Sequence, residues 1–283
     1  DDDEDEETTT EKPKKKLKVL TIPKNPTSLS DFGYCYNKEG KLVQEADNSK
    51  GFEWGGQKHY DALGDQIEKY IYNELSTTYQ LTELLLPLGE KDPNKASNIY
   101  HSAKAFTTTG PVFFIVHGAG AVRAGQWARS ICINNSIEQG SIFPYLRRAK
   151  KLGWEVIVAN PNKTETAKGW DIKGLDDQQA HVRYIWDCLI MKKCTNASNI
   201  IVVAHSYGGV AMVDLIGHRG DEVCKRVDAI AMTDSVHLLR RIRGMPKSRF
   251  YAPTKYLSDE EENWLYTHAK NWVKSKKTRQ TRA

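Results

Sequence analysis

The sequence has few features of a disulfide-stabilised, metal-binding or membrane-spanning protein. Its five cysteines are scattered over 283 residues, and no two of them form a C-x-x-C pair. Dispersed single cysteines indicate reduced thiols and a reducing compartment. No apolar run reaches the roughly 18 residues that a membrane helix needs, and no cysteine or histidine spacing matches a metal site. We therefore expect no metal ion, no other cofactor and no membrane partner.

Charge is abundant, but it is unevenly placed along the chain. Charged residues make up 27% of the sequence and hydrophobic residues 39%, which excludes a chain that is disordered throughout. The first seven residues are acidic, and the basic run KPKKKLK follows at 12–18. Two interpretations are compatible, namely solvated tails and a nuclear-import signal in the basic run. We predict a charged tail at 1–26, one domain at 27–275 and a basic tail at 276–283.

Short apolar segments alternate with amphipathic ones within the predicted domain. Nearly continuous apolar segments are typical of strands that are buried on both faces of a sheet, and alternation with helices favours parallel pairing. We therefore expect a doubly wound α/β domain with a mostly parallel sheet. A hairpin is expected before it, because Asn37 and Gly40 can form the turn between GYCY and KLVQ. Further strands are expected at 81–88, 112–116, 154–160, 199–205 and 227–234.

Apolar periodicity and capping residues predict the helices. Apolar residues recur at helical spacing over 58–76, Gly153 can end a helix over 141–152, and Asp176 can cap another. A helix is also expected at 208–217. The capping box SDEE at Ser258 predicts a last helix that extends to about 273, and the polar stretch 92–109 is expected to form a loop.

The residues AHSYGG follow directly on a buried apolar segment. Small residues two before and two after Ser206, namely Ala204 and Gly208, allow a sharp strand-to-helix turn that exposes the hydroxyl, as in a nucleophile elbow. The same turn would bring the N–H of Tyr207 close to the serine, where it can help to bind an oxyanion. The alternative is a tight turn in which Ser206 merely caps the next helix.

A glycine-rich segment, HGAGAVRAGQW, follows the apolar segment VFFIV. Hydrolases with a nucleophile elbow place a second oxyanion donor in a loop of this kind, so Gly118, Ala119 and Gly120 are the candidate donors. The alternative is a loop whose glycines serve only its backbone angles. Arg123 is a candidate anion anchor, because its guanidinium offers several donors in a fixed arrangement.

A nucleophilic serine needs a base within hydrogen-bond reach and an acid that orients the base. Asp234 follows an apolar segment and is the candidate acid, and His237 is the candidate base. The two lie on one short loop, which would have to bend unusually to form a Ser–His–Asp arrangement. His268 lies one helical turn after Trp264, which favours a packing role.

Four motifs together resemble one known family: HGAGAVRAGQWARSI, VIVANPN, AHSYGGVAMVDL and AIAMTDSVH. They are similar to the argonaute-binding-protein-two domain family, which includes animal cotranscriptional regulators and a domain fused to fungal class II histone deacetylases. The similarity covers about residues 30–275. It implies an α/β-hydrolase-like, three-layer fold with an N-terminal hairpin. It also implies a candidate nucleophile at Ser206 and, in family members, a further strand and a histidine-bearing loop where this sequence reads KSKKTRQTRA. We therefore expect an incomplete triad.

Three functions remain open at this point. The resemblance implies a regulator of gene expression in the nucleus and cytoplasm, with Argonaute-type and chromatin-associated partners, a role in splicing and small-RNA silencing, and indirect association with RNA. Alternatively, the protein is an esterase-like serine hydrolase that uses Ser206. A third interpretation is direct binding of nucleic acid by a basic segment, which comprises Arg240, Arg241, Arg243, Lys247 and Arg249.

Overall fold

The computed structural model describes residues 20–239 and 253–273. Both predicted charged tails and the basic segment at 240–249 therefore lie wholly or largely outside the described residues. The strands are β1 (Tyr34–Tyr36), β2 (Leu42–Gln44), β3 (Thr82–Leu86), β4 (Ser97–His101), β5 (Val112–Val116), β6 (Glu155–Val158), β7 (Ile200–His205), β8 (Val227–Thr233) and β9 (Ala269–Trp272).

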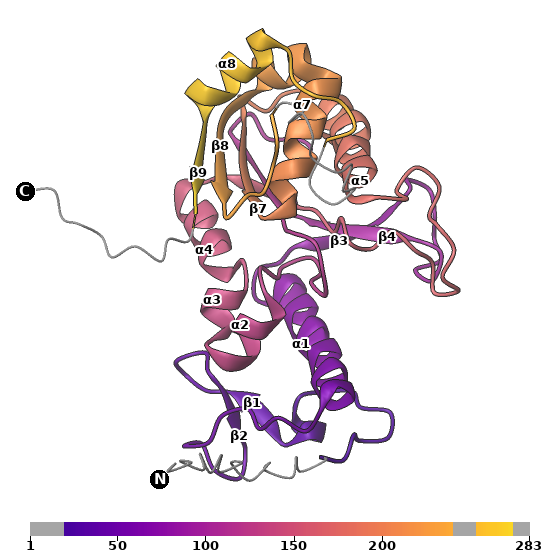
Figure 1. Cartoon of the computed structure of the whole chain (residues 1–283), viewed down its shortest axis with the longest axis vertical. Helices are drawn as coiled ribbons and strands as arrows, with labels where there is room; N and C mark the ends of the chain where they lie inside the picture. Colours follow the sequence, from indigo (N-terminus) through magenta and orange to yellow (C-terminus); the bar gives the residue numbers. More distant parts are fainter. Residues whose placement is uncertain (1–19, 240–252, 274–283) are drawn as a thin grey trace, which may run out of the picture.

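Helices connect these strands in the alternating pattern that the sequence predicts (Figure 1). They are the short η1 (Ser30–Phe32), α1 (Gln57–Thr77), α2 (Arg129–Asn134), α3 (Ile137–Gly140), α4 (Phe143–Leu152), α5 (Gln178–Ile185) with its π-helical continuation η2 (Trp186–Ile190), α6 (Met191–Lys193), α7 (Tyr207–Arg226) and α8 (Asp259–His268).

Seven strands form the main sheet, in the order β3-β4-β6-β5-β7-β8-β9. β4 runs antiparallel to both of its neighbours, whereas the strands from β6 to β9 are parallel. The strands β1 and β2 form a separate antiparallel hairpin. The mostly parallel sheet, the helices on both of its faces and the N-terminal hairpin confirm the predicted α/β-hydrolase-like fold.

Alternate strand residues supply the two cores of the three-layer arrangement. In β5, Phe114 packs with α5 and α7 on one face of the sheet, and Phe113 packs with α1 and α4 on the other. This alternation follows from the period of two along a strand. In Figure 1, α1 and the β1-β2 hairpin extend away from the sheet, at the end of the molecule opposite α8.

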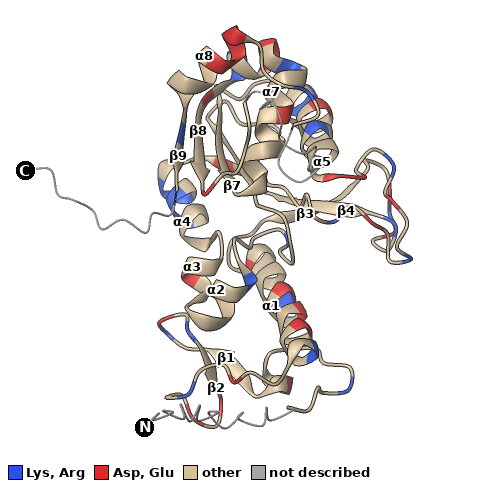
Figure 2. Cartoon of the chain, viewed as in Figure 1, with Lys and Arg blue, Asp and Glu red and all other residues tan. Residues whose placement is uncertain are grey.

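Charge is mixed over the described part of the chain. Figure 2 shows acidic residues gathered on α8 and basic residues on α4, with both signs along α1. The acidic first turn of α8 is favourable, because the helix dipole presents a partial positive charge there. Within residues 20–239 and 253–273, no helix is long and apolar enough to cross a membrane.

The structure corrects three local expectations. Residues 92–109, expected to be a loop, contain β4, because Ser97–His101 pairs with both β3 and β6. The predicted last helix does begin with the capping box of Ser258 and Glu261, but it ends at His268, and strand β9 follows. The N-cap of α5 is Asp177, one residue after the expected Asp176.

Candidate functional site

Ser206 lies in a strained turn between β7 and α7. Its backbone angles are φ 51° and ψ −117°, a conformation that L-residues with a side chain rarely adopt. The backbone holds the turn from both sides: the N–H of Ser206 donates to the carbonyl of Thr233 at 2.9 Å, and the N–H of Gly209 donates to the Ser206 carbonyl at 3.1 Å. The turn thus has the backbone geometry that a nucleophile elbow requires.

The Ser206 hydroxyl does not cap helix α7. Ser206 is the N-cap residue, yet its side chain accepts no hydrogen bond from the first turn. The hydroxyl is half-buried and makes no hydrogen bond to any residue in the described part of the chain. The alternative interpretation, a serine that is present only to cap the helix, therefore does not fit the structure.

Two glycines make room for this turn. A Cβ at Gly208 would lie 2.6 Å from the carbonyl oxygen of Val116, so the first turn of α7 packs directly against the end of β5. A Cβ at Gly118 would lie 2.8 Å from the Cβ of Ser206 and 3.3 Å from its Oγ. The glycine-rich loop therefore lies beside the candidate nucleophile, as the sequence predicts.

Strand register explains why these loops meet. Val116 of β5 pairs with Ala204 of β7, and His205 of β7 pairs with Thr233 of β8. Since parallel strands end at the same edge of a sheet, the segments after β5, β7 and β8 emerge side by side. Ser206 stands between the loop after β5, residues 117–127, and the loop after β8, residues 234–239.

Two asparagines after β6 hold the loop that follows β5. Asn162 Nδ2 donates to the carbonyls of Gly118 at 2.9 Å, Gly120 at 3.1 Å and Val122 at 3.0 Å. The fully buried Asn160 accepts from the N–H of Ala124 at 3.0 Å. Both residues stand in the motif VIVANPN, but no role was predicted for them from the sequence. An amide directly after a buried strand lies at the functional edge of a parallel sheet, and this position could have indicated their role.

Two histidines close to these contacts are buried: His117 begins the loop, and His181 lies on α5. Burial lowers the pKa of His117 to about 4 and that of His181 to about 3. His181 Nε2 accepts from the N–H of Asn160 at 3.2 Å, while His117 Nδ1 lies 2.8 Å from the Gly118 carbonyl. Both rings are therefore neutral near pH 7; His117 binds a carbonyl of the loop, and His181 binds the residue that holds Ala124.

The loop after β8 contains the candidate acid and base. Asp234 has a left-handed backbone with φ 47°, and Ser235 and His237 follow it. Ser235 Oγ lies 2.7 Å from His237 Nδ1, and burial lowers the pKa of the His237 ring. A Cβ at Gly209 would collide with the Ser235 hydroxyl and would lie 3.7 Å from His237 Nδ1. His237 thus lies next to the first turn of α7, where a hydroxyl holds it.

A second histidine, His205, lies near the same loop. Burial lowers the pKa of its ring, while a hydrogen bond with Thr233 and the negative charge of Asp234 oppose this shift. The His205 ring contacts Trp127 edge-on at 5.7 Å, and its Nδ1 lies 3.0 Å from the Thr233 hydroxyl. The Nδ1 of His237 contacts Ser235, and the pairing of Asp234 with His237 stays a prediction.

Tyr207 and His268 were also considered from the sequence as residues of this site. Tyr207 is the first residue of α7, so its N–H has no acceptor within the helix. His268 stacks on Trp264, with 4.6 Å between the ring centroids and 11° between the planes, which is a packing contact. Across residues 20–239 and 253–273, no group of three or more His, Cys, Asp or Glu side chains could hold a metal ion.

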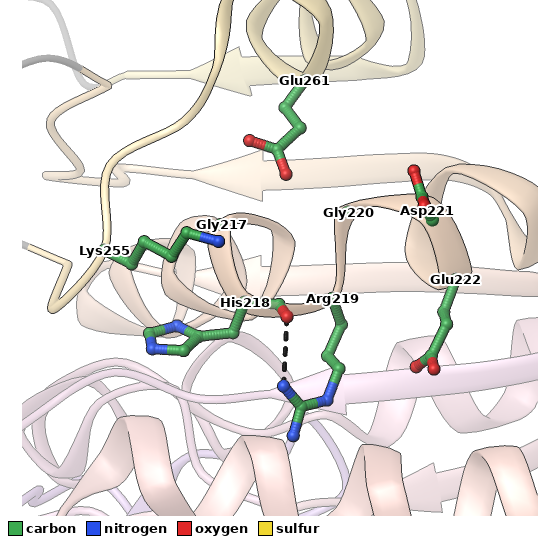
Figure 3. A pocket seen from close by; sticks show the side chains of 8 residues that line it. All are labelled: Gly217, His218, Arg219, Gly220, Asp221, Glu222, Lys255 and Glu261. Carbon is green, nitrogen blue, oxygen red and sulfur yellow. Dashed lines mark hydrogen bonds between the residues drawn. The ribbon is translucent and has the colours of Figure 1, made fainter.

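A separate cavity of about 350 Å³ lies further along α7 (Figure 3). The helix is interrupted at Arg219, whose φ of −135° is not helical. The guanidinium of Arg219 is paired with Asp187 at 2.8 Å and 2.9 Å, and the lining carries both basic and acidic groups. Because 12 residues separate Ser206 from His218 of the lining, roughly 18 Å at the helical rise, this cavity does not belong to the serine site.

The model of one protein family matches nearly the whole described chain. The Arb2 domain model matches residues 25–169 and 163–279. The chain belongs to the Arb2 domain family. The resemblance predicted from the four sequence motifs is thereby confirmed.

Cotranscriptional regulators from several organisms are similar in sequence to this Arb2 domain. The Cotranscriptional regulator ARB2A homolog of Dictyostelium discoideum is 35% identical over 287 residues, which covers 90% of this chain and 70% of that protein. The homolog of Xenopus tropicalis is 33% identical, and the Homo sapiens Cotranscriptional regulator ARB2A is 30% identical. Each match covers 75% of this chain and 64% of the relative. The chain thus spans about two thirds of the length of these relatives.

Solved structures with a similar arrangement are distant in sequence. A histone deacetylase from Saccharomyces cerevisiae matches with a TM-score of 0.47 and 12% identity, covering 77% of this chain and 82% of that one. An alpha-beta hydrolase from Vibrio vulnificus matches with a TM-score of 0.38 and 11% identity, covering 77% and 84%.

Proposed function

We propose that this Arb2 domain acts in the regulation of gene expression, as a binding module built on a hydrolase-like scaffold. The names of its relatives, Cotranscriptional regulator ARB2A and homologs, support the regulatory role. The surroundings of His237, the candidate base, support a binding role. There the ring of His237 is held by Ser235, and the Ser206 hydroxyl has no base as a hydrogen-bond partner among the described residues.

The partners that fit this role are Argonaute-type and chromatin-associated proteins, with RNA associated through them, in the nucleus and the cytoplasm. Co-precipitation of the full chain from nuclear and cytoplasmic fractions, with and without nuclease, tests this proposal. Argonaute and chromatin proteins should be recovered after nuclease treatment if they bind directly. Recovery that disappears with nuclease would show that nucleic acid bridges them, and recovery of neither class would contradict the proposal.

A second candidate function is a serine hydrolase of esterase type. The strained backbone and uncapped hydroxyl of Ser206, together with the adjacent Gly118, favour it. In such a reaction the Ser206 oxygen would bond to the acyl carbon as the ester C–O bond breaks. The proton of the hydroxyl would pass to His237 and then to the departing alkoxide, and water would release the acyl group by the reverse sequence.

A fluorophosphonate probe distinguishes the two candidates, since it forms a covalent bond with an activated serine. The hydrolase candidate predicts one adduct per chain, which Ser206→Ala abolishes and His237→Ala strongly reduces. The binding-module proposal predicts slow labelling that His237→Ala leaves unchanged. Intact-protein mass spectrometry gives the rate for each variant.

A further inference from the structure

The side chain of Asn162 gathers three carbonyl oxygens of one loop. Its amide nitrogen donates to the carbonyls of Gly118, Gly120 and Val122, all within 3.1 Å of the nitrogen. Since the nitrogen has two hydrogens, one of them is shared between two carbonyls. The three carbonyls belong to every second residue of the loop. Asn162 therefore fixes the orientation of three peptide groups that are separated by one residue each.

The orientation of a carbonyl also fixes the N–H of the same peptide group. In a planar trans peptide, the C=O and the N–H point in opposite directions. Since the carbonyls of Gly118 and Gly120 point toward Asn162, the N–H groups of Ala119 and Ala121 point away from it. Ser206 lies against Gly118 on this loop, with its Oγ 3.3 Å from the place of a Gly118 Cβ.

The amide of Asn162 is itself held in place. Gln178, at the start of α5, donates through Nε2 to Asn162 Oδ1, which leaves the Asn162 nitrogen facing the loop. Asn160, two residues earlier, binds the N–H of Ala124 at the far end of the loop and donates to Asn98 Oδ1 at 2.7 Å. The residues after β6 therefore fasten the loop from Gly118 to Ala124.

We infer that Asn162 is a positioning residue: by holding three carbonyls it turns the N–H groups of Ala119 and Ala121 toward the space beside Ser206, where they form an anion-binding face. The face suits an oxyanion or a carboxylate, because backbone N–H groups donate to negative oxygens without the entropy cost of ordering a long side chain. Its use in a reaction rests on the hydrolase candidate, but its geometry does not.

An anion placed at position 206 tests the geometry without any reaction. Ser206→Asp sets a carboxylate beside the loop, and Ser206→Asn is the neutral control of the same shape. The backbone amide resonances of Ala119 and Ala121, followed in ¹⁵N-labelled protein, should move downfield in Ser206→Asp relative to Ser206→Asn. Adding Asn162→Ala should abolish this difference, and adding Asn196→Ala, which changes an exposed asparagine, should leave it intact.

Labelling of the natural Ser206 adds a chemical readout. Asn162→Ala should slow fluorophosphonate labelling about tenfold or more, as loss of oxyanion donors does. Asn162→Asp should recover part of the rate as the pH is lowered, relative to the wild-type rate at each pH, because a protonated carboxyl regains one donor. Thermal unfolding of each variant separates this effect from a loss of fold.

The amide resonances test the positioning role of Asn162, and the labelling of Ser206 tests the hydrolase candidate. If the amide difference persists in Asn162→Ala, or is absent in the protein with Asn162 intact, the positioning role of Asn162 is wrong. If the amide difference behaves as expected but wild-type Ser206 is never labelled, the hydrolase candidate fails and the anion-binding face remains.

Discussion

The two flanks of Ser206 are built in different ways. On the β5 flank, two asparagines hold loop 117–127. The first residue of the loop, His117, is buried and neutral, as is His181, which binds the N–H of Asn160. On the β8 flank, one exposed asparagine of β9, Asn271, holds Ser235: its side chain accepts from the Ser235 N–H and donates to the Ser235 carbonyl, both at 3.2 Å. The exposed Asp234 precedes Ser235 in this loop.

The two flanks therefore offer different groups to a ligand beside Ser206. Side-chain amides bind four backbone groups of the loop on the β5 flank, so this flank offers a fixed set of backbone donors. The β8 flank places a histidine near the helix start but orients it through a hydroxyl. A hydroxyl stabilises a protonated imidazole less than a carboxylate does, so this flank is the weaker half for proton transfer.

Acid should weaken the β5 flank most, and this is the largest effect that we expect. Burial lowers the pKa of His117 to about 4 and of His181 to about 3, whereas both titrate near 6.5 in the unfolded chain. The unfolded state therefore binds more protons, and stability falls as the pH drops from 6.5 toward 4. At pH 5 the loss amounts to about 2 kcal/mol for each histidine.

Urea unfolding at pH 7, 6 and 5 measures this dependence. His181→Gln should remove about half of it, while His268→Gln, which changes a histidine stacked on Trp264, should leave it unchanged. Stability that does not change between pH 7 and 5 would contradict the neutral state of the two buried rings.

The contact between α7 and β5 should be the next most sensitive point. Gly208→Val places side-chain atoms against the Val116 carbonyl, where even a Cβ would be only 2.6 Å away. Overpacking of this kind costs about 3 kcal/mol. Gly51→Val is a matched control, because a Cβ at that position meets only the Leu42 carbonyl at 3.7 Å. Equal melting temperatures for the two variants would be incompatible with the close approach.

The strain at Ser206 predicts a gain in stability when it is relieved. Glycine adopts the observed φ of 51° without a steric penalty, whereas alanine keeps the penalty of a Cβ. Ser206→Gly should therefore be more stable than Ser206→Ala by about 1 kcal/mol, measured by chemical denaturation. If Ser206→Ala were the more stable variant, the turn would not be strained.

The smallest effect on stability should come from the β8 flank. Ser235→Ala removes the hydroxyl beside His237, but the residue is only half-buried, so the free energy of unfolding should change by less than about 0.5 kcal/mol. The ¹⁵N resonances of the His237 ring should nevertheless shift, because the ring loses the partner at Nδ1 that selects its tautomer. Unchanged ring resonances would show that Ser235 does not orient His237.

Local patterns in the sequence were sufficient for most of the fold. The elbow was predicted because AHSYGG follows a buried strand, and the first helix at 58–76 was confirmed as Gln57–Thr77. The errors arose where pairing partners decide the structure. The polar Ser97–His101 becomes a strand because it fills the gap between β3 and β6, and Ala269–Trp272 becomes one because β8 has a free edge there.

The site was predicted as far as its backbone geometry and no further. Strained turns and close glycine contacts leave a local signal in the sequence, as at Gly118 and Gly208. Side-chain partners that come from distant elements leave none. The contact of Ser235 with His237 depends on the conformation of one loop. The hydrogen bonds of Asn162 to the glycine-rich loop depend on the strand order, in which β6 lies beside β5.

The parallel pairing of β9 with β8 determines where the following residues begin. Trp272 pairs with Thr233, and its carbonyl accepts from the N–H of Asp234 at 2.7 Å, so the chain leaves β9 at the same edge of the sheet as Ser206. The next ten residues include five lysines and arginines. Two strand spacings separate β9 from β7, about 10 Å. A basic sequence therefore continues from the edge of the sheet at which the candidate nucleophile lies, two strands away from it.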